Sequence, residues 1–192
     1  MTDLGQGGEL LYWPAFVPGD EALMTRLLAA LPLRAERVRV RGRWHEQPRR
    51  VSWHGPGPYT YSGLTLQPDP WCEELLALRA RLGALLGQEP ASVLVNHYRD
   101  GRDCVSWHAD DEPEHGPDPT IASVSLGAAR RFLLRPKRDP SGRKHELLLG
   151  GGSLLVMRGT VQRHWLHCVP RTARPVGPRL NLTWRPWCPP AG

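Results

Sequence analysis

The sequence predicts a mainly β protein with flanking helices, built as an antiparallel sandwich or barrel. From Ser92 onward the chain consists of short β-type runs separated by Gly, Pro and Asp turns, with no helical pattern between them. The 20 Gly and 20 Pro among 192 residues indicate many turns. Only two segments, both before Ser92, have a clear helical pattern.

The two helices are expected at residues 20–31 and 69–86. Asp20 would cap the first helix, and Pro32 would end it. Asp69 would cap the second helix, with Pro70 at its first position and Gly87 at its end. Both segments are amphipathic, so each needs a surface to pack against.

Most of the net charge lies between these helices. Of the chain's formal charge of +6, the segment 34–50 carries +5, from seven Arg against Glu36 and Glu46. Val38 and Val40 alternate with arginines, the pattern of a strand that buries its valines and exposes its arginines. Such a row suits a phosphate backbone, although a solvated charged face is an equal alternative for this segment alone.

The β-type runs after Ser92 complete the expected fold. They span residues 92–98, 104–109, 120–127, 130–136, 145–150, 153–158, 163–169 and 178–184, with an exposed hairpin turn at 139–144. The length suits one domain, residues 1–192, with an N-terminal region of about 10–90 and a β core of about 91–187.

Cysteine spacing and hydropathy predict a cytosolic protein. The four cysteines form no C-x-x-C motif, so we expect reduced core thiols rather than a zinc knuckle or a disulfide framework. No stretch reaches the length of about 18 apolar residues that a membrane span needs, and the first residues lack a signal-peptide pattern.

The segment "SWHADDE", residues 106–112, suggests a metal site. His108 and Asp110 are two residues apart, so on a strand both side chains point to one face. The later run "RHWLHCVP" offers His164 and His167 on opposite faces, of which one can join. Two imidazoles and one carboxylate suit non-haem Fe(II); a zinc hydrolase and a surface hydrogen bond are the alternatives.

The last β-type run places four polar side chains on one face. Arg179, Asn181, Thr183 and Arg185 alternate with apolar residues, and two buried guanidinium groups are costly unless they meet an anion. A dicarboxylate would satisfy both arginines. Asn96 and Tyr98 add two neutral hydrogen-bonding groups. Iron together with a two-ended acid suggests 2-oxoglutarate.

These motifs together resemble the AlkB family of Fe(II)- and 2-oxoglutarate-dependent dioxygenases. The resemblance extends from about residue 38 to residue 187 and includes "PYTYSGLTLQPDPW" at 58–71 and "IASVSLGAARRF" at 121–132. Within the family the pattern is most similar to the mammalian homologues that repair methylated DNA and RNA.

The resemblance implies a fold and a set of site residues. The fold would be the double-stranded β-helix, or jelly roll, with N-terminal nucleotide-recognition hairpins and two supporting helices. The iron ligands would be His108, Asp110 and His167. Arg179 would bind the distal carboxylate of 2-oxoglutarate with Asn96 and Tyr98, and Arg185 would lie near the chelating carboxylate. Asn181 and Thr183 would line the same face.

The resemblance also implies an activity and a substrate. With Fe(II), 2-oxoglutarate and O2, the enzyme would hydroxylate the N-methyl group of 1-methyladenine or 3-methylcytosine. It would then release formaldehyde, succinate and CO2. A methyl group on the Watson–Crick edge requires a flipped base. Tyr59 and Tyr61 would form its pocket, with Tyr61 stacking opposite His108, and Asp111 would contact the base. An ordinary strand pair is the alternative for the two tyrosines, and no role is assigned to Glu112.

The strand preference depends on the hairpin tip Val40–Gly42. A duplex-repairing relative carries an aromatic residue where this chain has Arg41, a poorer hydrophobic plug. We therefore expect activity on single-stranded DNA or on both forms of DNA, with RNA as an alternative. We also expect the protein to be a monomer. The rival functions are a 2-oxoglutarate oxygenase for tRNA or protein and a non-catalytic nucleic-acid-binding module.

Overall fold

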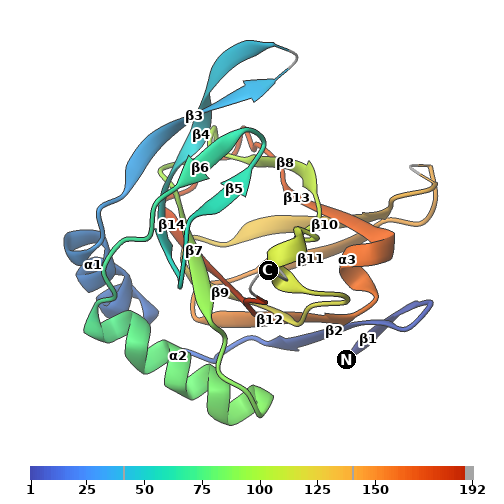
Figure 1. Cartoon of the computed structure of the whole chain (residues 1–192), viewed down its shortest axis with the longest axis horizontal. Coiled ribbons are helices and arrows are strands. Elements are labelled where there is room, and N and C mark those ends of the chain that lie inside the picture. Colours follow the sequence, from blue (N-terminus) through green and yellow to red (C-terminus); the bar gives the residue numbers. More distant parts are fainter. Residues whose placement is uncertain (41, 140, 189–192) are drawn as a thin grey trace.

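The computed structural model describes residues 1–40, 42–139 and 141–188, and gives no side-chain placement for Arg39 and Val40 (Figure 1). Two antiparallel sheets face each other in this part of the chain, and helices cover the outer face of the larger one. The predicted mainly β class is confirmed.

The larger sheet has eight strands in the order β1-β2-β12-β9-β14-β7-β4-β3. They are β1 (Thr2–Gly5), β2 (Gly8–Trp13), β12 (Ser153–Gly159), β9 (Ile121–Gly127), β14 (Arg179–Arg185), β7 (Ser92–Tyr98), β4 (Arg43–His54) and β3 (Arg34–Val40). Its central strands β9, β14 and β7 are buried along nearly their whole length. The sheet therefore continues from the β core into the N-terminal region.

The smaller sheet has four strands in the order β11-β10-β13-β8. They are β11 (His145–Leu149), β10 (Arg130–Pro136), β13 (Trp165–Val169) and β8 (Val105–His108). A two-stranded ribbon, β5 (Tyr59–Tyr61) and β6 (Leu64–Leu66), lies beside the larger sheet in Figure 1. A short 3₁₀ turn, η1 (Pro113–His115), follows β8.

The helices begin differently from the prediction, but they end where it placed them. Helix α1 (Asp20–Ala30) has Gly19 as its N-cap, because the Asp20 carboxylate instead accepts the N–H of Gly127 at 2.8 Å. Helix α2 (Glu73–Leu86) has Cys72 as its N-cap, later than expected, and Gly87 as its C-cap, as predicted.

A tertiary contact explains the late start of α2. The Asp69 carboxylate is bound by both the Arg34 guanidinium group, at 2.8 and 2.9 Å, and the Trp53 N–H, at 3.4 Å. The carbonyl oxygen of Pro70 contacts the His54 ring at 2.9 Å. Asp69 is thus engaged by β3 and β4 rather than by the helix end.

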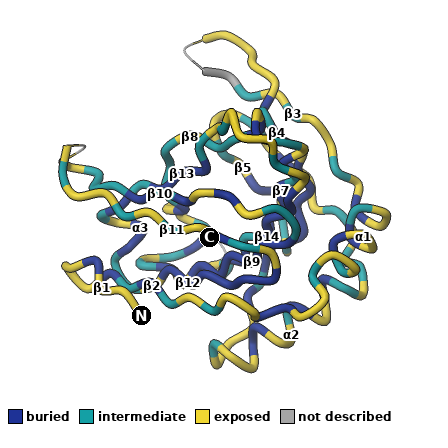
Figure 2. The backbone as a smooth tube through the Cα atoms, turned by 180° about the vertical axis from the view of Figure 1, so that it is seen from behind, coloured by how far each residue is buried: buried dark blue, intermediate teal, exposed yellow. Residues whose placement is uncertain are grey.

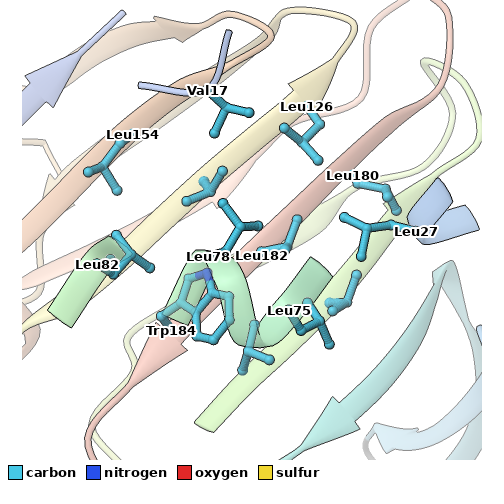
Figure 3. Close-up of a cluster of buried hydrophobic side chains, with 14 of the residues drawn as sticks. Val17, Leu27, Leu75, Leu78, Leu82, Leu126, Leu154, Leu180, Leu182 and Trp184 are labelled. Atoms are coloured by element: carbon cyan, nitrogen blue, oxygen red, sulfur yellow. The ribbon is translucent and has the colours of Figure 1, made fainter. Parts of the chain in front are cut away.

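The main core lies between the helices and the outer face of the larger sheet. Figure 3 shows Leu75, Leu78 and Leu82 of α2 against Leu182 and Trp184 of β14. The alternate residues of β14 point the other way, into the space between the sheets. The period-2 pattern therefore separates an apolar face for the helices from a polar face for the interior.

A second core closes the far end of the sandwich. Leu155 and Met157 of β12 pack there with Phe132, Leu134 and other residues of the smaller sheet and its surroundings. The polar residues of the site lie at the other end of the sandwich, near β8, β13 and β14. The packing agrees with the predicted jelly roll, with the site inside one end of it.

Burial differs sharply along the chain. Figure 2 shows the central strands as buried and the far end of the β3–β4 hairpin as exposed. Within the described residues, no helix combines the length and apolar character that crossing a bilayer requires. All four cysteines are free, but only Cys168 is buried and Cys188 is exposed, so the expectation of four core thiols was wrong.

Candidate active site

The structure brings the three predicted iron ligands together. His108 ends β8, Asp110 follows two residues later, and β13 pairs with β8 so that His167 lies opposite His108. One donor atom from each of the three residues lies within 4.8 Å of the others. His164 belongs instead to the helical turn α3 (Val161–His164), so the predicted strand 163–169 begins later than expected.

Neighbouring groups hold the ligands in position. The His108 Nδ1 atom lies 2.8 Å from the Ser106 carbonyl oxygen, which leaves Nε2 for a metal. The side chain of Gln162 accepts the Asp110 N–H at 2.9 Å, and Arg185 donates to Asp110 Oδ1 at 2.6 Å. The other oxygen, Oδ2, is buried without a hydrogen bond and faces His167 Nε2 at 3.5 Å.

The electrostatics keep two of the ligands, His108 and Asp110, in their metal-binding protonation states. Burial, together with His167, lowers the pKa of His108 to about 3, so its imidazole is neutral at pH 7. Burial raises the pKa of Asp110, but Arg185 and the two histidines outweigh it and hold that pKa well below its ordinary value. A neutral imidazole and an ionised carboxylate are the forms that bind Fe(II).

Arg179 is a buried cation without a charged partner among the residues that the structure describes. Its side chain is 0% exposed and donates to Ser125 Oγ, at 2.8 Å, and to Asn181 Oδ1, at 2.7 Å. Its Nε and Nη1 atoms have no hydrogen-bond partner, and it forms no ion pair within the described part of the chain. Burial lowers its pKa to about 10, so it remains charged at pH 7. These two donors fit a carboxylate.

The other predicted cosubstrate residues lie on the strand of Arg179 and on the strand next to it. Tyr98 pairs with Arg179 across β7 and β14, and its ring centroid lies 5.2 Å from the guanidinium carbon. Asn96 pairs with Asn181, whose amide donates to Thr183 at 2.9 Å. The structure therefore places all six predicted residues on the two adjacent strands, facing one interior.

One cavity of about 850 Å³ joins this region to the iron ligands. The cavity is lined by the three predicted iron ligands, by the predicted substrate residues Tyr59, Tyr61 and Asp111, and by five predicted cosubstrate residues. These five are Asn96, Tyr98, Asn181, Thr183 and Arg185. A cavity of this size can hold a small acid and a nucleobase together.

The two predicted base-pocket tyrosines form one wall. Their ring centroids are 5.1 Å apart. The Tyr59 hydroxyl donates to Glu112 Oε1 at 2.9 Å, and Tyr61 bonds with the side chain of Gln47, also at 2.9 Å. Burial raises the pKa of Glu112, which also faces His115 at 3.5 Å. Glu112, unassigned from the sequence, is thus part of the wall.

Arg49 is another residue that the sequence did not single out. It is buried, lines the cavity, and donates from Nε to Asn96 Oδ1 at 2.7 Å. Arg49 shares a strand face with Gln47 and Val51, which are also buried, and this period of two was the available signal; the excess of arginines in the segment concealed it.

The family comparison agrees with this geometry. Residues 10–185 match the model of the 2OG-Fe(II) oxygenase superfamily. The chain is 43% identical to mouse DNA oxidative demethylase ALKBH2, over 78% of this chain and 66% of that protein. It is 38% identical to mouse alpha-ketoglutarate-dependent dioxygenase alkB homolog 3, over 90% of this chain and 64% of that protein. The chain belongs to the AlkB family of 2OG-Fe(II) oxygenases.

The AlkB-family fold is also found among solved structures. The structure of OsALKBH1 superposes with a TM-score of 0.64 at 19% identity, over 96% of this chain and 99% of that one. The chain covers slightly less than two thirds of the length of the two mouse relatives. Family membership implies Fe(II), 2-oxoglutarate and O2, and the orphan atoms of Asp110 and Arg179 fit the first two.

One predicted substrate contact, Asp111, has a charged partner that the sequence did not predict. The Asp111 carboxylate lines the cavity but is bound by Lys137 Nζ at 2.5 Å. Arg41 and the side chain of Val40 lie outside the described residues; Gly42 has φ of 80°. Beyond the tip, Trp44 is 54% exposed, and the Arg37 guanidinium carbon lies 6.0 Å from its ring centroid. This exposed aromatic was not predicted from the sequence.

Proposed function

We propose that this protein is an oxidative demethylase that repairs N-methylated bases, 1-methyladenine and 3-methylcytosine, in DNA. The observation that carries the proposal is Arg179, a buried cation with free donors in the interior that also holds an iron-type triad. The ALKBH2 relatives, which are named DNA oxidative demethylases, support DNA as the substrate class.

The cosubstrate would be held by the polar face of β14. Arg179 would bind one carboxylate of 2-oxoglutarate through its unpaired Nε and Nη1. Tyr98 and Asn96 lie on the adjacent strand, within reach of the same ligand. Because Arg179 is fully buried, this ion pair would form away from water, where it is strong.

His108, Asp110 and His167 would hold the iron. Bound Fe(II), with 2-oxoglutarate and O2, supplies the oxidation that hydroxylates the N-methyl carbon. The hydroxymethyl base then releases formaldehyde. Arg185 fixes the Asp110 carboxylate through a 2.6 Å bond, so one oxygen remains directed at the site. No side chain acts as a general base in this scheme; the protein positions the groups and excludes water.

The methylated base would enter beside the tyrosine wall. Because a base within a duplex cannot reach a buried iron, it must be flipped into the cavity. Tyr59 and Tyr61 offer ring faces for stacking, and Glu112 offers a carboxylate beside them. These contacts recognise the ring without requiring a particular neighbouring sequence.

The polynucleotide would bind along the arginine hairpin, which we define as residues 34–50. Its excess of +5 attracts phosphates, and it borders the cavity through Val38 and His45. Single-stranded DNA or both forms of DNA are the proposed substrates. RNA as a substrate, a monomeric state and a cytosolic location stay predictions.

The activity can be tested directly. The purified protein is loaded anaerobically with Fe(II) and 2-oxoglutarate, then exposed to air with single- and double-stranded oligonucleotides that carry 1-methyladenine or 3-methylcytosine. Mass spectrometry should show the loss of one methylene unit, which His108→Ala and omission of 2-oxoglutarate both abolish. Succinate formation without demethylation would contradict the DNA substrate and favour tRNA or protein. No turnover of 2-oxoglutarate would contradict the iron site itself and favour a zinc hydrolase or a non-catalytic module.

A further inference from the structure

Lys137 binds a carboxylate of the cavity wall. Its Nζ lies 2.5 Å from Asp111 Oδ2, and its side chain is only 25% exposed. Its backbone N–H donates to the His164 carbonyl oxygen at 2.8 Å, which anchors it where β10 ends. The lysine is therefore held beside Asp111 rather than free to move away from it.

The acidic residues 110–112 each have a partner. Asp110 is bound by Arg185 at 2.6 Å, and Glu112 accepts the Tyr59 hydroxyl at 2.9 Å. Asp111 is the most exposed of the three, with a side chain that is 57% exposed, and its partner is a lysine outside the cavity wall. Of the three contacts, the one to Lys137 is the easiest to remove without disturbing the iron ligands.

The charge of a methylated base depends on which ring nitrogen carries the methyl group. Methylation at N3 of cytosine adds to a lone pair, so the ring becomes a cation beside an exocyclic amine. Methylation at N3 of thymine replaces a proton, so the ring stays neutral and has a carbonyl oxygen instead. A carboxylate without a cationic partner would favour 3-methylcytosine for two reasons: it attracts the cationic ring, and it accepts a hydrogen bond from the exocyclic amine. A carboxylate neutralised by lysine would favour it less.

We propose that Lys137 is a specificity-determining residue that withholds Asp111 from the base and so weakens the preference for cationic bases over neutral ones. The inference rests on the proposed demethylase function and narrows its substrate class. It predicts that this enzyme accepts neutral N-methylated bases better than a variant without the lysine does. The enzyme's preference between the two bases is the difference in its affinity for their transition states. Lys137 weakens the affinity for the transition state of the cationic base more than that for the neutral base.

The test measures kcat/KM on two single-stranded oligonucleotides that differ only in 3-methylcytosine or 3-methylthymine. The Lys137→Met variant should raise the cytosine-to-thymine ratio about threefold to fivefold, the range of a partly exposed ion pair. Lys144→Met, an exposed lysine of the same turn, is the matched control and should leave the ratio unchanged. A general loss of phosphate attraction lowers both rates together and cancels in the ratio.

A double-mutant cycle links the effect to Asp111. Asp111→Asn should lower the ratio, and adding Lys137→Met to it should change the ratio no further. An unchanged ratio in Lys137→Met, or an equal rise in the Asp111→Asn background, would overturn the inference while leaving the demethylase intact. If the wild-type protein turns over neither base, the proposed function fails, and the inference with it.

Discussion

The interior site and the arginine hairpin differ in how firmly their functional groups are held. In the interior, many polar atoms of the site are bound by residues of other segments, and the buried atoms without a partner among the described residues include Asp110 Oδ2 and the Nε and Nη1 donors of Arg179. On the hairpin, Trp44 is more than half exposed, and Arg37 is exposed beside it. The interior is thus prepared for small ligands before they bind, whereas the hairpin can adapt to a flexible polymer.

The largest expected effect is that of removing the unpaired cation. Arg179→Met should raise the KM for 2-oxoglutarate by about 100-fold or more, because a buried carboxylate would lose its only charged partner. The free protein should not lose thermal stability, since a buried charge without a counter-ion is costly. The KM is measured by succinate formation, and Tm by calorimetry. A clear drop in Tm would contradict the absence of a charged partner.

Arg185 lies on the same strand and is just as buried, yet its replacement should act differently. Arg185→Met leaves Asp110 buried without its cation and should cost about 3 to 5 kcal/mol of unfolding free energy. Affinity for divalent metal should fall about 10- to 100-fold, because Asp110 loses the group that orients it. Metal titration and urea unfolding measure the two effects. Equal stability of the Arg179→Met and Arg185→Met variants would contradict this contrast.

His115 should make stability depend on pH. Burial, together with Arg185, lowers its pKa to about 4 in the folded protein, from 6.5 when unfolded. The unfolded state therefore binds the proton more tightly, and lowering the pH from 7 to 5 favours unfolding. His115→Gln should reduce the stability lost over this interval by about 2 kcal/mol. Urea unfolding at both pH values checks this, and an identical loss in variant and wild type would refute it.

Trp44 should contribute to binding of the polymer but not to the interior chemistry. Trp44→Ala should weaken binding of a long single-stranded oligonucleotide about fivefold, near the low end for base stacking because the ring is partly exposed. The KM for 2-oxoglutarate should not change. Tyr12→Ala, an exposed aromatic on β2 far along the sheet, is the control. If both variants weaken binding equally in fluorescence anisotropy, the hairpin has no special role.

The smallest expected effect concerns Arg41. Arg41→Phe should raise duplex activity relative to single-strand activity about threefold, because an aromatic ring fills the gap left by a flipped base better than a guanidinium group does. Initial rates on matched single- and double-stranded substrates give the ratio. An unchanged ratio would count against the assignment of residues 40–42 to this task.

Strands and ligand spacing could be predicted from the sequence because they follow from local periodicity. The pattern of β14 alone placed Arg179 and Arg185 inside the sandwich, and the spacing of His108 and Asp110 put them on one side of the site. The choice between iron and zinc, and between His164 and His167, depended on the resemblance to the AlkB family.

The contacts that the sequence did not predict join residues far apart in the chain. Asp69 does not cap α2 because Arg34 binds it, and Asp111 faces Lys137, 26 residues away. Glu112 belongs to the tyrosine wall of the cavity because it accepts a hydrogen bond from Tyr59, 53 residues earlier in the chain. Local pattern contains no information about such partners, so these roles appear only once the strands are arranged in space.

The most direct test of the central claim is to measure formaldehyde and succinate together, with a 3-methylcytosine oligonucleotide as substrate. We expect the two products in equal amounts from the wild-type protein, and neither from the Asp110→Asn variant. Succinate without formaldehyde would show that the interior site consumes its cosubstrate while the cavity does not accept the methylated base, and would contradict the account.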